Sequence, residues 1–229
     1  MAVSTSSAPT TFQQELTATA QHLASVLPPA AAQTIDGGIT TVATSGLASR
    51  ALQAGQVAPG FTLPSATNEP VALAQLLQQG PVVLVFYRGN WCPYCNVQLR
   101  AYQQLLPELA QHGATLVAVS PQTPDLTSLT ASEKSLTFLV LSDVGNVVAR
   151  QYGLAYKVGA EVADTLRSVG IDLAAHNGTA DDELPLTATF IIGTDGLVKW
   201  SWAEANFKHR ADPAEILDAL AQATAPQTA

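Results

Sequence analysis

Two cysteines are the residues of this sequence best suited to chemistry. Cys92 and Cys95 are the only cysteines among 229 residues, and two positions separate them. Two thiols at this spacing can form a reversible disulfide and so pass electrons to a substrate. A zinc site would need four ligands, but the four histidines are scattered singly along the chain. We therefore interpret the pair as a redox dithiol that works without a metal or other cofactor.

The surrounding sequence predicts a strand that delivers this dithiol to the start of a helix. An apolar run, Pro81–Tyr87, precedes the cysteines, and Pro93 suits the first helical position because it lacks an N–H. Unpaired N–H groups and the helix dipole favour a thiolate there. Arg88 adds a cation that can reach the sulfur of Cys92 or a bound oxidant, and Trp91 should report oxidation by fluorescence.

Thiolate formation alone increases the reaction rate of a thiol only slightly. A free cysteine with a pKa of about 8.5 is roughly 3% thiolate at pH 7, and lowering the pKa to about 7 raises that fraction about 16-fold. Intrinsic nucleophilicity falls meanwhile by about fivefold, so the net gain is only about threefold. A fast peroxidase must therefore also polarise the O–O bond with positioned donors.

Composition excludes several classes of function. Charged residues make up 12% of the chain and the net charge is −8, which lacks the basic surface that binds nucleic acids or anionic membranes. No apolar stretch approaches the roughly 18 residues of a membrane span. The first ten residues lack the basic and apolar regions of a secretory signal. These features predict a cytoplasmic protein, in which a close cysteine pair is more often catalytic than structural.

The first 50 residues form a predicted N-terminal helical extension. Apolar residues recur at helical spacing within residues 11–27, and Pro28 and Pro29 end that helix. Residues 30–54 are weakly patterned and suit a second helix and a linker. We expect the extension, residues 1–50, to pack against the main domain, residues 51–229, or to mediate a homodimer.

The main domain shows the pattern of an α/β fold. Four short apolar runs predict buried strands, at residues 82–87, 115–119, 138–141 and 189–192. Helical patterns separate them, Pro107 should kink or end the first of these helices, and Asp195-Gly196 signals a final hairpin. Residues 155–186 suggest an inserted polar loop with one short helix. Together these elements predict a mixed central sheet flanked by helices.

Several segments together resemble a known family. Their order along the chain is that of the alkyl hydroperoxide reductase C / thiol-specific antioxidant family: Gln56–Pro64, Val71–Leu73, Val83–Cys95, Leu141–Asp143, Gln151–Leu154 and Thr189–Gly196. The resemblance covers roughly residues 55–222, and the subgroup is similar to peroxiredoxin-like proteins with a Cys-x-x-Cys motif. It implies a thioredoxin-like fold and thiol-based reduction of a peroxide or disulfide.

The sequence departs from that family's pattern at two places. Typical members carry Pro-x-x-x-Thr/Ser-x-x-Cys, and the corresponding positions here are Arg88, Cys92 and Cys95. A pocket arginine is usual near the start of the late strand, where this chain has Thr187. Thioredoxin-like relatives place a proline there, so Thr187 fits neither pattern. Arg88 is our candidate to replace the missing arginine.

The two family patterns assign the attacking thiol differently. A thioredoxin-like geometry makes Cys92 the exposed nucleophile at the helix start and Cys95 the sheltered resolving thiol. The peroxiredoxin alignment instead places the attacking thiol at Cys95. Expected exposure favours Cys92, but the sequence leaves both open.

The resemblance implies a peroxiredoxin-like thiol peroxidase that reduces hydroperoxides through a dithiol/disulfide cycle. Thioredoxin, or glutathione with glutaredoxin, would restore the dithiol. The alternatives are a thioredoxin- or glutaredoxin-like disulfide oxidoreductase without strong peroxidase activity, and a non-enzymatic redox sensor. Turnover with peroxide separates the first from the other two.

Overall fold

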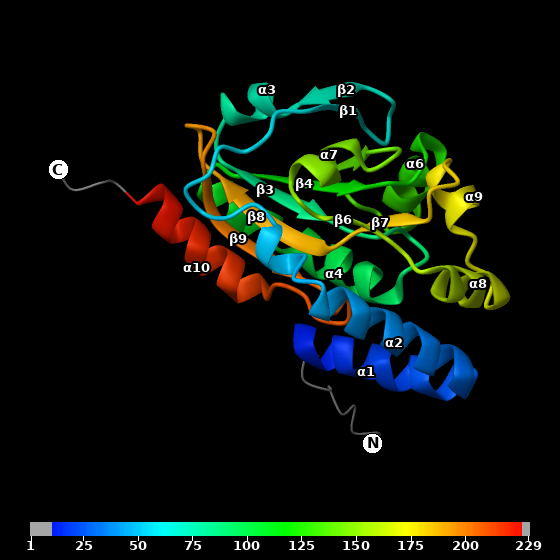
Figure 1. Cartoon of the computed structure of the whole chain (residues 1–229). Coiled ribbons are helices and arrows are strands. Elements are labelled where there is room, and N and C mark those ends of the chain that lie inside the picture. The colour runs from blue at the N-terminus through cyan, green and yellow to red at the C-terminus, as the bar shows by residue number, and fades with distance from the viewer. Residues whose placement is uncertain (1–10, 226–229) are drawn as a thin grey trace, which may run out of the picture.

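A five-stranded mixed sheet forms the centre of the molecule (Figure 1). The computed structural model describes residues 11–225. The strand order is β5-β4-β3-β8-β9, with β3 parallel to β4, β4 parallel to β5, and β8 antiparallel to both β3 and β9. The strands are β3 (Val82–Phe86), β4 (Thr115–Ser120), β5 (Leu139–Ser142), β8 (Thr187–Ile192) and β9 (Val198–Glu204). The predicted strands, the mixed sheet and the final hairpin are therefore confirmed.

Strand β3 is buried on both faces, as its continuous apolar sequence predicts. Its alternate side chains point into two separate hydrophobic clusters. Helices α4 (Pro93–Gln104) and α10 (Pro213–Thr224) cover one face, and α3 (Leu73–Leu77) and α7 (Val147–Gln151) cover the other. The central strand thus ends, at Phe86, between two filled layers.

Shorter elements complete the main domain. Helix α4 ends at Gln104, and α5 (Leu106–Gln111) begins two residues later with Pro107 in its first turn, as predicted. Strand β4 is followed by α6 (Pro124–Glu133), and β1 (Thr62–Pro64) pairs with β2 (Pro70–Ala72). Within residues 11–225, no helix is long and apolar enough to cross a membrane.

Two helices precede the sheet in sequence. Helix α1 (Phe12–Val26) starts at a capping box, in which Thr11 and Gln14 exchange hydrogen bonds, and α2 (Pro29–Thr44) follows after Pro28. A single 3₁₀ turn, η1 (Ala48–Arg50), leads into the main domain. Helix α1 packs against α4, and α2 packs against α8 (Ala160–Ser168). The predicted helices are present, and the boundary at residue 50 stays a prediction.

The region 155–186 is more ordered than the sequence suggested. The expectation of a polar loop with one short helix was wrong, because the region holds β6 (Ala155–Lys157), α8 (Ala160–Ser168), α9 (Leu173–Asn177) and β7 (Glu183–Pro185). Strands β6 and β7 pair antiparallel. Beneath the polar surface lies a small separate core, formed by Val158, Ala163, Leu166, Leu173 and Leu184. Its few apolar residues are too widely spaced for the pattern to stand out in the sequence.

Candidate active site

The two cysteines lie at the start of α4, directly beyond the central strand. Cys92 is the N-cap residue with extended backbone angles (φ −90°, ψ 111°), Pro93 occupies the first turn, and Cys95 follows inside the helix. Both are buried, with exposed fractions of 1% for Cys92 and 0% for Cys95. The prediction of an exposed Cys92 was therefore wrong. Cys92 nevertheless lines a cavity, whereas Cys95 lies behind it.

Arg88 lies beside the dithiol, four residues before Cys92. Its side chain is buried, and Nη1 is 4.0 Å from the sulfur of Cys92. The guanidinium carbon lies 3.8 Å from the ring centre of Phe207 and 4.8 Å from that of Trp91. These aromatic faces stabilise the cation and fix its position. The structure thus places Trp91 in contact with Arg88 as well as next to Cys92.

A second arginine, which sequence reasoning missed, contacts the other sulfur. Arg210 lies in the loop between β9 and α10, is 4% exposed, and places Nη2 3.3 Å from the sulfur of Cys95. Its Nη1 donates to the carbonyl oxygens of Phe207 and His209. Arg210 and Cys95 are 115 residues apart in the sequence and share no motif. The only signal was the helix start at Asp212-Pro213, which places Arg210 just before α10.

Thr187, the position where the family pattern suggested an arginine, has a structural contact instead. It is buried at the start of β8 opposite Glu204 of β9, and its hydroxyl donates to the carbonyl oxygen of Glu204 (3.4 Å). Arg88 and Arg210, rather than residue 187, bring guanidinium groups to the dithiol.

The two arginines imply a negative charge at the sulfurs. Within residues 11–225, no carboxylate lies within ion-pair distance of Arg88 or Arg210. A buried charge without a partner is costly, so buried cations are paired. The thiols of Cys92 and Cys95 lie beside these guanidinium ions and can become anions, whereas burial raises the pKa of the nearby Tyr94, Tyr102 and Tyr156. The positive charge of Arg88 and Arg210 therefore favours a thiolate at one of these sulfurs.

The hydrogen bonds assign that charge to Cys95. Burial alone would raise the pKa of Cys95, but the thiol of Cys92 donates to its sulfur, and Arg210 and Arg88 supply positive charge and a backbone N–H. Together these contacts hold the pKa of Cys95 well below that of an ordinary thiol. Burial, and then donation to Cys95, raise the pKa of Cys92. Of the two thiols, Cys95 is therefore the one whose ionised form is favoured.

Helix α4 also holds the loop that carries Arg210. The hydroxyl of Tyr102 donates to the carbonyl oxygen of Ala211 (2.8 Å), and Nε2 of Gln98 donates to that hydroxyl (3.2 Å). Burial raises the pKa of Tyr102 to about 12, so the hydroxyl keeps its proton. Cys95, Gln98 and Tyr102 lie three and four positions apart and share one face of the helix. One face of α4 therefore positions both the sulfur of Cys95 and Ala211, the residue that follows Arg210.

A glycine shapes the loop between the strand and the dithiol. Gly89 has a φ of +152°, and a Cβ there would lie 2.5 Å from Nε1 of Trp91. The N–H of the next residue, Asn90, donates to Oε1 of the fully buried Gln122. The loop can therefore hold Trp91 beside Arg88 only with glycine at position 89.

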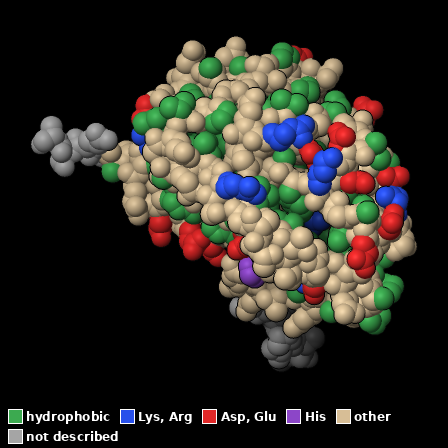
Figure 2. Space-filling model, viewed as in Figure 1, with side chains coloured by type: hydrophobic (Ala, Val, Ile, Leu, Met, Phe, Trp, Pro, Cys, Tyr) green, Lys and Arg blue, Asp and Glu red, His purple; other side chains and the backbone are tan. Residues whose placement is uncertain are grey.

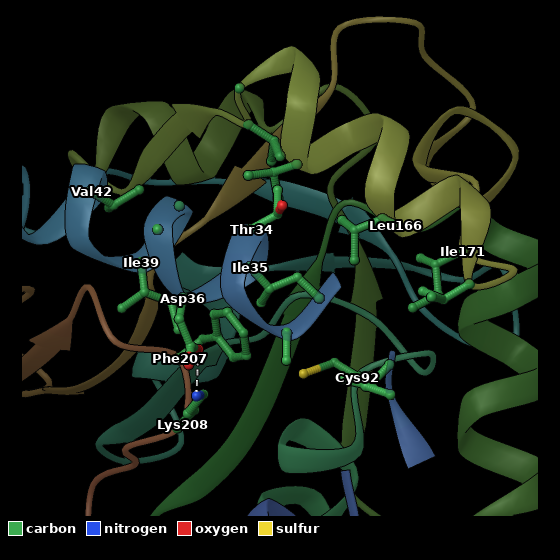
Figure 3. Close-up of a pocket in the computed structure, with 18 of the residues that line it drawn as sticks. Thr34, Ile35, Asp36, Ile39, Val42, Cys92, Leu166, Ile171, Phe207 and Lys208 are labelled. Carbon is green, nitrogen blue, oxygen red and sulfur yellow. Dashed lines mark hydrogen bonds and ion pairs between the residues drawn. The ribbon is translucent and has the colours of Figure 1, made fainter. Parts of the chain in front are cut away.

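The cavity beside Cys92 is large and mainly apolar, with a volume of about 1030 Å³. Helix α2 supplies Ile35, Ile39 and Val42, and the opposite side carries Leu166 and Ile171 (Figure 3). The sulfur of Cys92 points toward the cavity, on the side of Ile35 and Phe207. In the space-filling view a hollow on this face exposes hydrophobic side chains, with basic side chains beside it (Figure 2).

An ion pair at the wall of this cavity joins helix α2 to the loop after β9. Nζ of Lys208, in the loop after β9, lies 2.6 Å from Oδ1 of Asp36 on α2 (Figure 3). Lys208 follows Phe207, the residue that packs on Arg88. The pair therefore ties the N-terminal helices to the loop that carries Phe207 and Arg210.

Comparison with known families identifies this architecture. Residues 54–201 match the model of the AhpC/TSA family. The chain belongs to this family. The five-stranded sheet with the dithiol at a helix start is its thioredoxin-like fold, as the resemblance implied.

Individual relatives are peroxiredoxins. Peroxiredoxin Bcp of Escherichia coli K12 is 36% identical over 104 residues, a match that covers 45% of this chain and 65% of that relative. A putative peroxiredoxin bcp of Helicobacter pylori J99 is 27% identical over 172 residues, 74% of this chain and 98% of the relative. The crystal structure of peroxidoxin BcpB from Mycobacterium tuberculosis aligns with a TM-score of 0.60 and 25% identity, over 77% of this chain and 99% of that one.

Proposed function

We propose that this AhpC/TSA protein is a thiol peroxidase that reduces hydroperoxides through a disulfide between Cys92 and Cys95. The contact of Arg210 with Cys95, 3.3 Å from Nη2 to Sγ, carries the proposal because it supports a buried thiolate inside a family of peroxiredoxins. The relatives named peroxiredoxin support the same reaction.

The first step oxidises Cys95. Its thiolate attacks the terminal oxygen of the hydroperoxide, the O–O bond breaks, and the sulfur becomes a sulfenic acid. The leaving alkoxide takes a proton and departs as an alcohol, or as water when the substrate is hydrogen peroxide. Cys92 holds the nearest thiol proton, since it donates to Cys95 in the reduced protein.

The second step forms the disulfide. The thiolate of Cys92 attacks the sulfenic sulfur of Cys95, an S–S bond forms, and hydroxide leaves and is protonated to water. An external dithiol then returns two electrons and two protons. In each cycle the terminal peroxide oxygen leaves as water and the other oxygen stays in the alcohol, or in a second water when the substrate is hydrogen peroxide, so two electrons and two protons balance the reaction.

Arg88 and Arg210 supply what thiolate formation alone does not. Two guanidinium ions and one thiolate leave a net positive charge in a buried site. That charge stabilises the oxygen anion that develops as the O–O bond breaks, an effect worth about 10²–10³ in rate for one donor in other enzymes. In this proposal the two arginines polarise the O–O bond in place of the proline and hydroxyl residues of the Pro-x-x-x-Thr/Ser-x-x-Cys motif, which this chain lacks.

This assignment makes Cys95, rather than Cys92, the attacking thiol. Arg210 contacts the sulfur of Cys95 and the pKa of Cys95 is lowered, whereas burial raises the pKa of Cys92 at the cavity wall. We propose that the terminal peroxide oxygen reaches Cys95 past the side chain of Cys92, which rotates about its Cα–Cβ bond. Thr187 supports the sheet, and Pro93 and Trp91 support the helix start and the position of Arg88.

The same geometry assigns the site of re-reduction. In the disulfide, Cys92 is the sulfur that borders the cavity, so an external thiol forms a mixed disulfide there. Cys95 then leaves as a thiolate, and a thiol of low pKa is the better leaving group. Thioredoxin, or glutathione with glutaredoxin, is our proposed reductant. We also propose a cytoplasmic location and, as a role for the extension, homodimer formation.

A disulfide oxidoreductase is the second candidate, because the Cys-x-x-Cys motif is intact and one of its thiols has a depressed pKa. Stopped-flow tryptophan fluorescence after mixing with hydrogen peroxide and cumene hydroperoxide separates the two. We expect a rate of about 10⁴ M⁻¹s⁻¹ or more for wild type and for Cys92→Ser. Loss of the reaction in Cys95→Ser would identify Cys95 as the attacking thiol.

Other outcomes have definite meanings. A fast reaction kept by Cys95→Ser and lost by Cys92→Ser would make Cys92 the attacking thiol. A wild-type rate no higher than that of a free thiol, together with reduction of insulin disulfides, would establish the oxidoreductase instead.

A further inference from the structure

Oxidation of the dithiol changes the charge balance of the buried site. In the reduced protein the guanidinium groups of Arg88 and Arg210 lie beside sulfurs that can ionise, 4.0 Å from Cys92 and 3.3 Å from Cys95 respectively. A disulfide between these cysteines has no proton to lose, so neither sulfur can carry a negative charge. Each arginine is only 4% exposed. Oxidation therefore leaves two buried cations without the sulfur anion that faced them.

The carboxylates near this site do not replace that anion. Within residues 11–225, no carboxylate lies within ion-pair distance of either arginine. Asp36, which lines the cavity, pairs with Lys208 at 2.6 Å. Asp212, two residues after Arg210, accepts the N–H of Ala214 at the start of α10 (3.0 Å). Because an unpaired buried charge is costly, the oxidised site should take up an anion from solution.

Arg88 is the cation that such an anion can reach. It borders the cavity together with Cys92, and its buried Nε has no hydrogen-bond partner within residues 11–225. Arg210 does not line the cavity, and its Nη1 already donates to two carbonyl oxygens. An anion in the cavity would therefore accept a hydrogen bond from Arg88, while Arg210 would attract it through its charge.

The surroundings of Arg88 favour an anion that gives up water easily. The rings of Phe207 and Trp91 lie against its guanidinium group, and the cavity beside it is mainly apolar. Apolar walls cannot replace the water that an anion loses on burial, and this loss is most costly for a strongly hydrated dianion such as sulfate. A monovalent halide loses less and still neutralises one arginine.

We propose that the disulfide form binds one small, weakly hydrated monovalent anion, of the class of chloride and bromide, beside Arg88, and that reduction releases it. On reduction two electrons and one proton enter, the S–S bond breaks, Cys92 takes the proton and Cys95 becomes a thiolate as the anion leaves. The net charge of the site stays the same. This inference goes beyond the proposed function, since it requires the disulfide but not a peroxide.

The test measures how far bromide shifts the disulfide equilibrium. The protein is equilibrated at neutral pH in a redox buffer that leaves it half oxidised, bromide replaces gluconate at constant ionic strength, and free thiols are counted by alkylation. Because one anion binds only the oxidised form, the ratio of oxidised to reduced protein should rise about fivefold between 10 and 100 mM bromide. Sulfate in place of bromide should leave the ratio within twofold.

Two variants locate the anion. Arg88→Met should remove the dependence on bromide, measured in a redox buffer that leaves the variant half oxidised. Arg167→Met is the matched control, because it removes an exposed arginine of α8 that does not line the cavity, and it should keep the full dependence. A dependence that Arg88→Met retains would overturn the assignment of the site to Arg88.

Melting temperature gives a readout that needs no redox buffer. Bromide should stabilise the diamide-oxidised protein and the double variant Cys92→Ala/Cys95→Ala, which also lacks ionisable thiols, but not the reduced wild type. A disulfide form that shows no response to bromide in either measurement would overturn the inference and leave the proposed function intact. Equal stabilisation of oxidised and reduced protein would also overturn it. A response to bromide without peroxide turnover would overturn the proposed function and support the anion site.

Discussion

The dithiol site and the start of α7 each bury an acidic group near a helix N-terminus, but the pKa of that group is lowered at the dithiol and raised at α7. Asp143 is 2% exposed and accepts the N–H groups of Val148 (3.0 Å) and Ala149 (2.9 Å). Burial nevertheless raises its pKa. Cys95, which is fully buried, has a pKa well below that of an ordinary thiol. Cys95 differs because the thiol of Cys92 donates to it and the guanidinium ions of Arg210 and Arg88 add positive charge.

The comparison shows what a helix terminus can do alone. Backbone N–H groups lessen the cost of a buried anion at Asp143 but do not offset it. At Cys92, the N-cap of the longer helix α4, burial and the hydrogen bond to Cys95 raise the pKa although Arg88 and Arg210 lie nearby. The sequence-based expectation that the helix start favours a thiolate is not met at Cys92, because burial and the hydrogen bond to Cys95 raise its pKa. The pKa is lowered only at Cys95, where a hydrogen bond from the thiol of Cys92 is combined with the positive charge of Arg210 and Arg88.

Removal of the Arg210 charge should have the largest effect. Arg210→Met keeps the bulk of the side chain but leaves the anion of Cys95 without its nearest cation, so the pKa of Cys95 should rise. The thiolate would then be lost as the pH falls through the raised pKa, at pH values where wild type still reacts. We expect the rate with peroxide at neutral pH to fall about 10²–10³-fold. Stopped-flow rates and thiolate ultraviolet absorbance, each followed against pH, measure both effects.

Arg210→Lys serves as the matched control because it keeps the charge without the planar fork. Its rate should lie between those of wild type and Arg210→Met. A pH profile of Arg210→Met that coincides with wild type would show that helix N–H groups suffice at Cys95, against the comparison with Asp143.

Arg88→Met should have a smaller effect, about 10–100-fold on the rate with peroxide. Arg88 lies farther from sulfur than Arg210 does, at 4.0 Å from Cys92 against 3.3 Å from Cys95. Methionine retains packing against the aromatic rings, so melting temperature should change little. Stopped-flow rates measure the loss, and an unchanged rate would leave Arg210 as the only arginine that acts on the reaction.

The sequence was sufficient to predict the central architecture. Continuous apolar runs gave the buried strands, Pro93 gave the first turn of α4, and the family resemblance gave the thioredoxin-like fold. These signals are local or are carried by short motifs. The order within 155–186 was missed because its small core rests on isolated apolar residues such as Leu166 and Leu184.

The electrostatics of the site could not be predicted in the same way. Arg210 is brought to Cys95 by the pairing of β8 with β9 and by the loop that follows, and no spacing in the sequence encodes that distance. The prediction that Cys92 is exposed was also wrong. The groups that surround Cys92 come from parts of the chain remote from the motif, such as Phe207 and α2. Long-range contacts of this kind follow from the fold as a whole.

Tyr102→Phe tests whether the placement of Arg210 matters as well as its charge. The variant loses the hydrogen bond to Ala211 and should cost about 1 kcal/mol of stability. A shifted loop would also weaken the contact of Arg210 with Cys95, raise the pKa of Cys95 and slow the peroxide reaction by up to about tenfold.

Tyr152→Phe is a matched control for Tyr102→Phe. Tyr152 donates a similar hydrogen bond, 3.0 Å to the carbonyl oxygen of Pro59, but lies in the other hydrophobic cluster. It should lose similar stability in a urea titration without any shift in the pH profile of the reaction. Equal shifts in both variants would make the role of Tyr102 merely structural.

Asp143→Asn should have no effect on the dithiol and a modest effect on stability. The amide retains one acceptor but turns its NH₂ toward a backbone N–H, which should cost about 1–3 kcal/mol at acidic pH. Because the folded-state pKa of Asp143 is raised, its contribution to stability is present below the unfolded-state pKa of about 3.9 and is lost as pH rises through the folded value. The stability difference between wild type and variant should therefore shrink from acidic to neutral pH.

Urea titrations across that range measure this difference in stability. A difference that grows with pH would mean that the helix terminus stabilises the Asp143 anion more than burial destabilises it.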